Sequence, residues 1–388
     1  MGHRQRISRK ARGARELSLR IAVTLGAMNP AAVTEHDRDS LRDALTAMGE
    51  KAFRADQVLK HLYTRCVTSY DDMTDLPAAL RERLKAELPL LSTGKPGEHR
   101  SRDGTTKLLV PCADGQPVEC VLIPEPPGKT PPERRTVCVS SQAGCPVGCV
   151  FCASGLAGLA RNLTAGEIVE QVVRAGALLR KRFPGMDHPV NNVVFMGMGE
   201  PFYNLERVIA AIERLNAGWG MQIGLNRITV STVGVEGGVG RLAAHPLAPN
   251  LALSLHAPND AIRARIVPFP KALSVADLVE EGVRYQRKTG KEVTCEYVML
   301  AGVNSGPEHA RELARRLSGK GLKVNLIPYN AVEGLGYEAP SAREASAFQE
   351  VLERAGIPAP VRRARGDRIA AACGQLRLRQ VTGAAEAR

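Results

Sequence analysis

Residues 136–173 read TVCVSSQAGCPVGCVFCASGLAGLARNLTAGEIVEQVV and encode a strand, a loop and a helix in succession. Thr136–Val139 is a short apolar run that predicts a buried strand. Thr164 and Glu167 form a T-x-x-E capping box, which predicts the first turn of a helix. Apolar side chains then follow on one helical face: Ile168, Val169, Val172 and Val173. Cys145, Cys149 and Cys152 therefore lie on a loop after a strand, and Cys138 lies in the strand itself.

The same alternation of strand and amphipathic helix continues to about residue 330. Predicted strands are Thr136–Val139, Val190–Met196, Arg227–Ser231, Asn250–Leu255, Glu292–Leu300 and Lys323–Ile327. Parallel strands need helical crossovers, so six such units predict a parallel barrel or an open parallel sheet in the α/β class. In these folds the functional groups gather at the carboxyl ends of the strands.

The residues before the first of these strands have a different pattern. Apolar residues recur at helical spacing over 37–87, and alternating runs at 107–110 and 118–123 flank the turn Ala113-Asp114-Gly115, which predicts a β-hairpin. We expect five regions. They are a basic arm (1–36), a helical accessory domain (37–100), a hairpin with a proline-rich linker (101–135), the barrel with a C-terminal cysteine segment (136–380) and a tail (381–388).

Charge and cysteine content limit the possible functions. The 388 residues carry a net charge of +13, and the first twenty residues hold seven basic side chains and one acid, which favours a polyanionic partner such as RNA. No apolar run has the length of a membrane span, so we expect a cytoplasmic protein with no membrane contact. Nine cysteines are an odd number, which favours reduced thiols with chemical roles over a disulfide scaffold.

Cys145, Cys149 and Cys152 are spaced so that three thiolates can converge on a soft metal centre. A zinc site completed by a distant ligand is one interpretation, because zinc normally takes four protein ligands. An iron–sulfur cluster with one open iron is another, because an ordinary [4Fe–4S] cluster takes four cysteines. Three buried structural cysteines are the third interpretation. The spacing alone leaves all three open.

Several longer motifs follow one another along the chain. They are KAFRADQVLKHLY (51–63), CVSSQAGCPVGCVFC (138–152), ARNLTAGEIVEQV (160–172), NNVVFMGMGEPFYN (191–204), SLHAPND (254–260), NLIPYN (325–330) and RARGDRIAAACGQL (363–376). Together and in this order they resemble one family, the radical S-adenosylmethionine (SAM) RNA adenine methyltransferases of the RlmN/Cfr class. The similarity runs from about residue 40 to about 380. It implies a partial (β/α)6 radical-SAM barrel with a small N-terminal helical accessory domain and a β-hairpin extension.

The resemblance also implies a set of site residues. Cys145, Cys149 and Cys152 would hold one [4Fe–4S] cluster whose open iron binds SAM. The family's SAM contacts fall on Gly199, Glu200, Ser231, Ser254, Leu255, His256 and Asn330. Cys373 would carry a methyl group as S-methylcysteine, Cys138 would resolve the intermediate through a transient disulfide with Cys373, and Glu119 would accept the ring proton. Cys66, Cys112, Cys120 and Cys295 match no functional position, and we assign them to packing.

The implied reaction consumes two SAM molecules. One methylates Cys373, and the second is cleaved to a 5′-deoxyadenosyl radical that activates this methyl group for addition to adenine C2. The family's substrates are an adenosine in the peptidyl-transferase centre of 23S rRNA and the adenosine 3′ of the anticodon in tRNAs. We expect a monomer and an external, flavodoxin-type electron donor. The basic stretch from Arg362 to Arg379 would meet RNA phosphates.

Two alternatives and one departure from the pattern remain. The C8-methylating, antibiotic-resistance branch uses the same machinery, although Pro201 and the Arg365-Gly366-Asp367 run are more like the C2 branch. A non-catalytic RNA-binding protein with an iron–sulfur or zinc centre is the second alternative. Leu156 and Leu159 stand where a polar and an aromatic residue are expected, which bears on substrate scope.

Overall fold

One nine-stranded sheet runs through the computed structural model, which describes residues 31–124, 131–156, 158–362, 366 and 369–376. Six of its strands are parallel neighbours. They are β4 (Arg135–Cys138), β7 (Asn192–Phe195), β8 (Ile228–Thr232), β9 (Asn250–Ser254), β10 (Val293–Met299) and β11 (Lys323–Pro328). These are the strands predicted from the sequence, in the predicted order, and they confirm the α/β class.

The predicted hairpin continues this sheet. It consists of β2 (Thr106–Pro111) and β3 (Pro117–Pro124), and β3 pairs antiparallel with β4, with Val121 opposite Cys138. A further strand, β1 (Gly97–Arg100), pairs with β2. It was not predicted, because all four of its residues are exposed and none has an apolar side chain that would indicate a strand. The hairpin therefore sits beside the first barrel strand.

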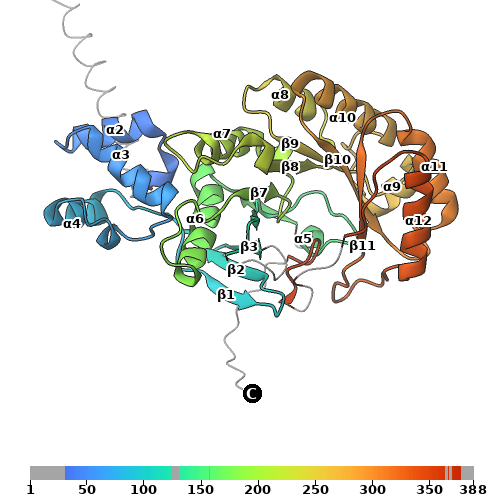
Figure 1. The fold of residues 1–388 in the computed structure, drawn as a ribbon, viewed down its shortest axis with the longest axis horizontal. Helices are drawn as coiled ribbons and strands as arrows, with labels where there is room; N and C mark the ends of the chain where they lie inside the picture. The colour runs from blue at the N-terminus through green and yellow to red at the C-terminus, as the bar shows by residue number, and fades with distance from the viewer. Residues whose placement is uncertain (1–30, 125–130, 157, 363–365, 367–368, 377–388) are drawn as a thin grey trace, which may run out of the picture.

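Helices cross over between the parallel strands and cover the outer face of the sheet (Figure 1). The crossover helices are α6 (Ala165–Arg182), α7 (Leu205–Asn216), α8 (Gly238–Ala244), α9 (Asp260–Ile266), α10 (Val275–Thr289) and α11 (Pro307–Leu317). A further helix, α12 (Ala342–Arg354), follows the last strand and packs beside α11. The predicted capping box is present at the start of α6, where Thr164 Oγ1 accepts from the Glu167 amide and the Glu167 carboxylate accepts from the Thr164 amide.

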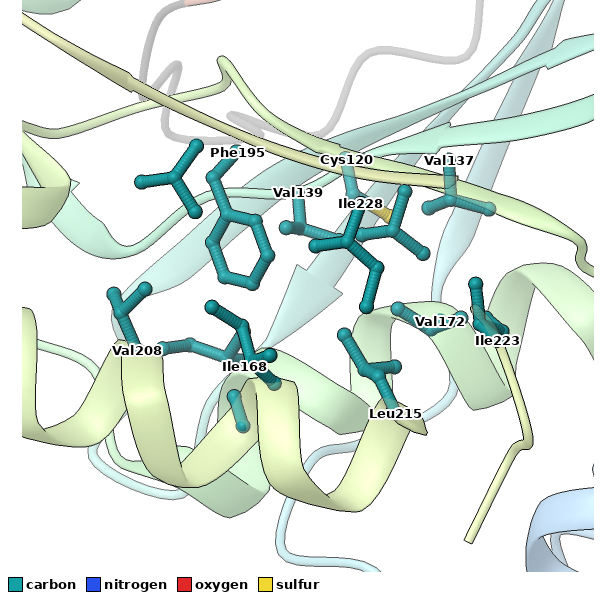
Figure 2. Packing of buried hydrophobic residues seen from close by; sticks show 14 of the residues in the cluster. Cys120, Val137, Val139, Ile168, Val172, Phe195, Val208, Leu215, Ile223 and Ile228 are labelled. Atoms are coloured by element: carbon teal, nitrogen blue, oxygen red, sulfur yellow. The ribbon is translucent and has the colours of Figure 1, made fainter. Parts of the chain in front are cut away.

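The main core lies between the sheet and the helices that cover it, and Figure 2 shows the part of this core that packs against α6 and α7. Val137, Val139 and Phe195 point from the strands toward Ile168 and Val172 of α6, and all five side chains are at most 1% exposed. Strand residues alternate between the two faces, so the other face of the same strands is left to line the interior of the barrel. That face carries Cys138, Val194 and Met196.

The N-terminal helices form a separate layer at one end of the molecule (Figure 1). They are the 3-10 turn η1 (Val33–Glu35), α2 (Arg38–Ala47), α3 (Phe53–Leu59) with its π-helical continuation η2 (Lys60–Thr64), the turn η3 (Tyr70–Asp72) and α4 (Ala78–Glu87). Glu170 of α6 joins this layer to the barrel, because its carboxylate accepts hydrogen bonds from Thr34, Ser92 and Thr93.

A short second sheet flanks the cysteine loop. It pairs β5 (Gln142–Gly144) with β6 (Leu159–Asn162), and the four-residue helix α5 (Ala153–Leu156) lies between them. These small elements lack a periodic apolar pattern and were not predicted. Over the described part of the chain, no helix combines the length and apolar character needed to cross a membrane.

Candidate active site

Two adjoining cavities open at the carboxyl ends of the parallel strands. The smaller, about 150 Å³, is lined by the three loop cysteines together with residues that end β7, β8, β9 and β10. The larger, about 490 Å³, extends toward β3 and β4 and is lined by Val121, Ile123, Cys138, Arg134 and Arg362 among others. Cys373 and Cys152 line both cavities. Cys373 therefore stands at the boundary between the two spaces.

The cysteine loop presents its three thiols on one wall of the smaller cavity. Backbone hydrogen bonds hold the loop: the Cys145 amide donates to Gly158 O at 2.9 Å, and the Cys152 amide donates to Cys149 O at 3.1 Å. Burial raises the pKa of the Cys145 thiol to about 12 and raises that of Cys149 well above its ordinary value, with the charges of the neighbouring cysteine thiols adding to the effect. The thiols of Cys145 and Cys149 therefore favour the protonated form when no metal is bound.

The donor set fits an iron–sulfur cubane. Across the described residues, no three His, Cys, Asp or Glu side chains converge as they would around a single ion. Each cysteine of a [4Fe–4S] cluster binds a different iron, so the thiols need not converge on one point. Metal binding deprotonates a coordinating thiol, which overcomes the raised pKa values. Three cysteines would hold such a cluster with one iron left open to a further ligand.

Gly199 and Glu200 follow β7 and line the smaller cavity. Gly199 has φ +106°, and a Cβ atom there would lie 2.7 Å from Gln142 Cβ, so the position needs glycine. The Glu200 carboxylate accepts the amide of Phe202 at 3.0 Å through Oε1 and the amide of Val233 at 2.9 Å through Oε2. Burial raises the pKa of Glu200 to about 7, against the lowering effect of these hydrogen bonds.

Polar groups from β8 and β9 complete this wall. Ser231 Oγ lies 3.1 Å from Ser254 Oγ, and His256 follows them in a left-handed conformation with φ +60°. His256 Nδ1 accepts the amide of Val298 at 3.1 Å, so the neutral ring carries its proton on Nε2. Burial lowers the pKa of His256 to about 3, which keeps the ring neutral. Leu255 does not line either cavity, because its side chain belongs to the main core.

The segment that carries Cys373 is held by the cluster loop and by the end of β11. Gly374 O accepts the Ala153 amide at 2.7 Å, and Leu376 O accepts Ser154 Oγ at 2.7 Å. Asn330, predicted as a SAM contact, donates to Cys373 O at 3.2 Å and lines the larger cavity. Desolvation by the surrounding chain raises the pKa of the Cys373 thiol, and the Arg362 guanidinium opposes this.

Cys138 lines the larger cavity from β4, whereas Glu119 lies on the neighbouring strand β3 and lines neither cavity. Cys138 ends β4, lines the cavity and is buried, and burial followed by the charge of Cys373 raises its thiol pKa to about 12. All nine cysteines are free thiols in this structure. The side chain of Glu119 is only 5% exposed, and its Oε1 lies 3.1 Å from Lys107 Nζ. An acid at an alternating strand position usually faces solvent, but the Glu119 carboxylate is buried.

Two functional candidates were missed by the sequence analysis. Arg263 of α9 is 4% exposed, and its guanidinium donates to the carbonyl oxygens of Leu255, Leu273, Val233 and Ser254, which holds the ends of β8 and β9 together. Glu296 of β10 lines the smaller cavity, and its Oε2 is buried without a hydrogen-bond partner. Burial raises the pKa of Glu296. A charged residue within an otherwise apolar strand was the available signal for Glu296, whereas nothing local marks Arg263.

The four cysteines assigned to packing and the two unexpected leucines do not line the two cavities. Cys66, Cys112, Cys120 and Cys295 lie in the main core, as expected for packing residues. Leu156 and Leu159 are 50% and 43% exposed beside the cysteine loop, and neither lines the two cavities. Five of the six arginines in the basic stretch from Arg362 to Arg379, all but Arg362, lie outside the described residues, as does the arm over residues 1–30.

Known proteins share this arrangement. Residues 33–89 match the model described as "Ribosomal RNA large subunit methyltransferase N-terminal domain", and residues 139–317 match the radical SAM superfamily. A probable dual-specificity RNA methyltransferase RlmN from Rhodopirellula baltica is 45% identical, over 87% of this chain and 88% of its own length. The dual-specificity RNA methyltransferase RlmN of Nitratidesulfovibrio vulgaris is 44% identical, over 88% and 94%.

A solved structure agrees with these sequences. The crystal structure of a radical SAM methyltransferase from Sphaerobacter thermophilus is 43% identical and superposes with a TM-score of 0.83, covering 90% of this chain and all of that one. The relatives span the accessory helices, the hairpin and the barrel together. The chain therefore belongs to the RlmN family of radical SAM RNA methyltransferases.

Proposed function

We propose that this protein methylates C2 of an adenosine in the peptidyl-transferase centre of 23S rRNA and of the adenosine 3′ of the anticodon in tRNAs. The observation that carries the proposal is the position of Cys373 on the shared boundary of the two cavities. A methyl group on its sulfur is reachable from the smaller cavity, where SAM would bind. It is also reachable from the larger cavity, whose volume suits an extruded base.

Different residues of the chain would act in different steps of the reaction. Cys145, Cys149 and Cys152 would hold one [4Fe–4S] cluster. SAM would contact Gly199, Glu200 and the strand-end residues Ser231, Ser254 and His256 in the smaller cavity, with Asn330 reaching it from the adjoining larger cavity. Leu255, which the family resemblance also suggested, is packed in the core and is left out of this set. The bound cluster and SAM supply hydrogen-atom abstraction. Two SAM molecules are used per turnover, one for the methyl group placed on Cys373 and one for its activation.

The later steps belong to thiols and a carboxylate. The activated S–CH2 carbon of Cys373 would bond to C2, Glu119 would accept the C2 proton, and the one electron that the adduct loses would return to the oxidised cluster held by the three loop cysteines. The Cys138 thiolate then attacks the Cys373 sulfur, so a disulfide forms as the carbon–sulfur bond breaks and the ring CH2 takes up a proton to become the methyl group. Two electrons from an external, flavodoxin-type donor reduce the disulfide. Covalent catalysis of this kind splits one difficult step into easier ones.

RNA binding is supported by the positive charge around the larger cavity. Arg134 and Arg362 line this cavity, and guanidinium groups bind phosphate well. We expect the accessory helices to contact folded RNA outside the cavity, and binding to weaken with salt. We further propose that the protein acts as a monomer in the cytoplasm, where rRNA and tRNA are found.

Nuclease digestion and mass spectrometry of RNA nucleosides test this proposal. Protein reconstituted with iron and sulfide under anaerobic conditions should convert adenosine to 2-methyladenosine in both 23S rRNA and tRNA. Cys138→Ser should stop turnover and accumulate a covalent protein–RNA adduct, because no thiol is left to release Cys373. Cys295→Ser, a change at a buried core thiol on β10, serves as the matched control.

Two outcomes contradict the proposal. Detection of 8-methyladenosine alone would assign the chain to the C8-methylating branch. If peptide mass spectrometry never finds a methyl group on Cys373 in protein from cells replete with SAM, the chain is a non-catalytic RNA-binding protein with a metal centre.

A further inference from the structure

Lys107 of β2 contacts two parts of the site that are distant in sequence. Its Nζ lies 3.1 Å from Glu119 Oε1 on the neighbouring strand and donates to Ala370 O, three residues before Cys373, at 3.4 Å. The Lys107 side chain is 13% exposed. Most lysine side chains extend into solvent. A lysine whose ammonium group is largely buried and bound by two oxygen atoms therefore has a specific structural role.

The strand register explains how Lys107 reaches both partners. Lys107 is opposite Val121 and Leu109 is opposite Glu119, so these four side chains share one face of the hairpin. Val121 packs with Cys138 and with Ala371 on that same face. The hairpin face that bears Lys107 and Glu119 therefore continues into the wall of the larger cavity.

One further hydrogen bond, at a place where the two backbones come close together, holds the Cys373 segment to this hairpin. Gly366 donates its amide to Asp103 Oδ2 at 3.2 Å. Gly366 has φ +67°, and a Cβ atom at this position would lie 2.8 Å from Thr105 Cγ2. Together with the Lys107 contact to Ala370, these interactions hold the segment from the β2 side, while α5 and Asn330 hold it from the cluster side.

We propose that Lys107 is a positioning residue for proton removal: its ion pair fixes the Glu119 carboxylate on the hairpin face that continues into the larger cavity, and its bond to Ala370 keeps the Cys373 segment in register with that carboxylate. The inference rests on the proposed roles of Glu119 and Cys373. A carboxylate as buried as Glu119 is costly to ionise without a cation, and only the ionised form can accept the C2 proton. Lys107 acts through Glu119 and does not touch the reacting atoms.

The proposal assigns Lys107 to one step of the reaction. Methylation of Cys373 and cleavage of SAM precede proton removal, so both should survive its loss. In Lys107→Met we expect Cys373 still to carry its methyl group and 5′-deoxyadenosine still to form. Release of 2-methyladenosine should fall at least about ten-fold and the protein–RNA adduct should accumulate, because a positioned acid or base contributes about 10² or more to such steps. The KM for RNA should stay within about two-fold.

A double-mutant cycle separates positioning from folding. If Lys107 acts through Glu119, Lys107→Met/Glu119→Gln should be no slower than Glu119→Gln alone. This double variant also removes both charges, so neither is left buried without a partner. Lys107→Arg should recover most of the rate. Lys323→Met, which breaks the exposed ion pair with Glu292 at the opposite strand end, is the matched control and should turn over normally.

The possible results distinguish failure of the Lys107 role from failure of the Glu119 role and from failure of the proposed function. Wild-type turnover by Lys107→Met overturns the positioning role, as does a loss confined to Cys373 methylation or to RNA affinity. Losses that add in the double variant overturn it too. Wild-type turnover by Glu119→Gln would instead refute the proposed proton acceptor, and absence of 2-methyladenosine from the wild-type protein would refute the proposed function itself.

Discussion

The amide of Ala153 donates to the carbonyl of Gly374 at 2.7 Å, which joins the cluster loop directly to the segment that carries Cys373. The two residues are 221 positions apart, yet one hydrogen bond sets the spacing between the cysteines that would hold the cluster and the cysteine that would carry the methyl group. Ser154 strengthens the joint through Leu376 O. The geometry of the proposed site therefore depends on a short helix, α5, and not on the barrel strands alone.

Loss of the hydrogen bond from Ser154 Oγ to Leu376 O should make the Cys373 segment more mobile. Ser154→Ala leaves the carbonyl of Leu376 without its buried partner, and we expect a loss of stability of about 1 kcal/mol and faster hydrogen exchange over residues 369–376. RNA methylation should fall several-fold. Ser274→Ala removes an N-cap bond of α10 at similar cost in stability, and it should leave both exchange in this segment and methylation unchanged. Equal exchange in the two variants would contradict the prediction.

Glu170 should determine how firmly the accessory helices are held on the barrel. Its buried carboxylate accepts from Thr34 Oγ1 at 2.5 Å, from the Ser92 amide at 2.8 Å and from the Thr93 amide at 2.7 Å. Glu170→Ala leaves these donors unpaired, so we expect unfolding to become easier by about 3 kcal/mol or more and the KM for tRNA to rise. Calorimetry and steady-state kinetics measure the two effects.

Glu170→Gln keeps one acceptor oxygen and should lie between the wild type and Glu170→Ala in both measurements. SAM affinity should not change, because Glu170 faces the accessory layer and not the cavities. A large loss of SAM binding in Glu170→Ala would mean that the whole barrel had been disturbed.

Glu200 should make the stability of the metal-free protein depend on pH. Its pKa is raised to about 7 from an ordinary 4.5, so the folded state holds a proton that the unfolded chain releases. The contribution of Glu200 to the free energy of unfolding is fully present below about pH 4.5. It is lost as the pH rises through about 7, which lowers the free energy of unfolding by about 3 kcal/mol. Urea unfolding at several pH values, compared with Glu200→Gln, isolates this group. A difference between the two proteins that stays constant with pH would contradict the prediction.

Arg263 should be required for the SAM-binding wall even though it faces no cavity. Its guanidinium donates to four carbonyl oxygens around the ends of β8 and β9, next to Ser254 and His256. Lysine has a single ammonium and cannot bridge all of these acceptors. We expect Arg263→Lys to fold but to bind SAM at least about ten-fold more weakly by calorimetry on cluster-loaded protein. Arg265→Lys, on the same helix with no such contacts among those described, should bind SAM normally.

Local patterns in the sequence predicted much of this molecule for definite reasons. Buried parallel strands are continuous apolar runs, so β4 and β7 to β11 could be recognised one by one. The capping box of α6 is a contact between Thr164 and Glu167, three residues apart, and is visible in the chain itself. By contrast β1 is polar and exposed, and it exists as a strand only because β2 offers it an edge.

The site residues divide in the same way. The cysteine spacing and the strand-end positions of Glu200, Ser231 and His256 are local properties, and they indicated which side chains would line one cavity. The pairing of Glu119 with Lys107, the four carbonyls around Arg263 and the unpartnered oxygen of Glu296 could not be predicted, because each depends on groups that meet only after the chain has folded.

By itself, the sequence determined the parallel α/β class, the three-cysteine loop and, through its motifs, the family, because periodicity, capping and spacing act over a few residues. Only the tertiary structure decided that the hairpin extends the main sheet and that Lys107 meets both Glu119 and the Cys373 segment. It also placed Cys373 between two cavities. The physical reason is that strand pairing and burial bring together residues up to 263 positions apart, and no local propensity encodes which distant partner will shield a buried charge.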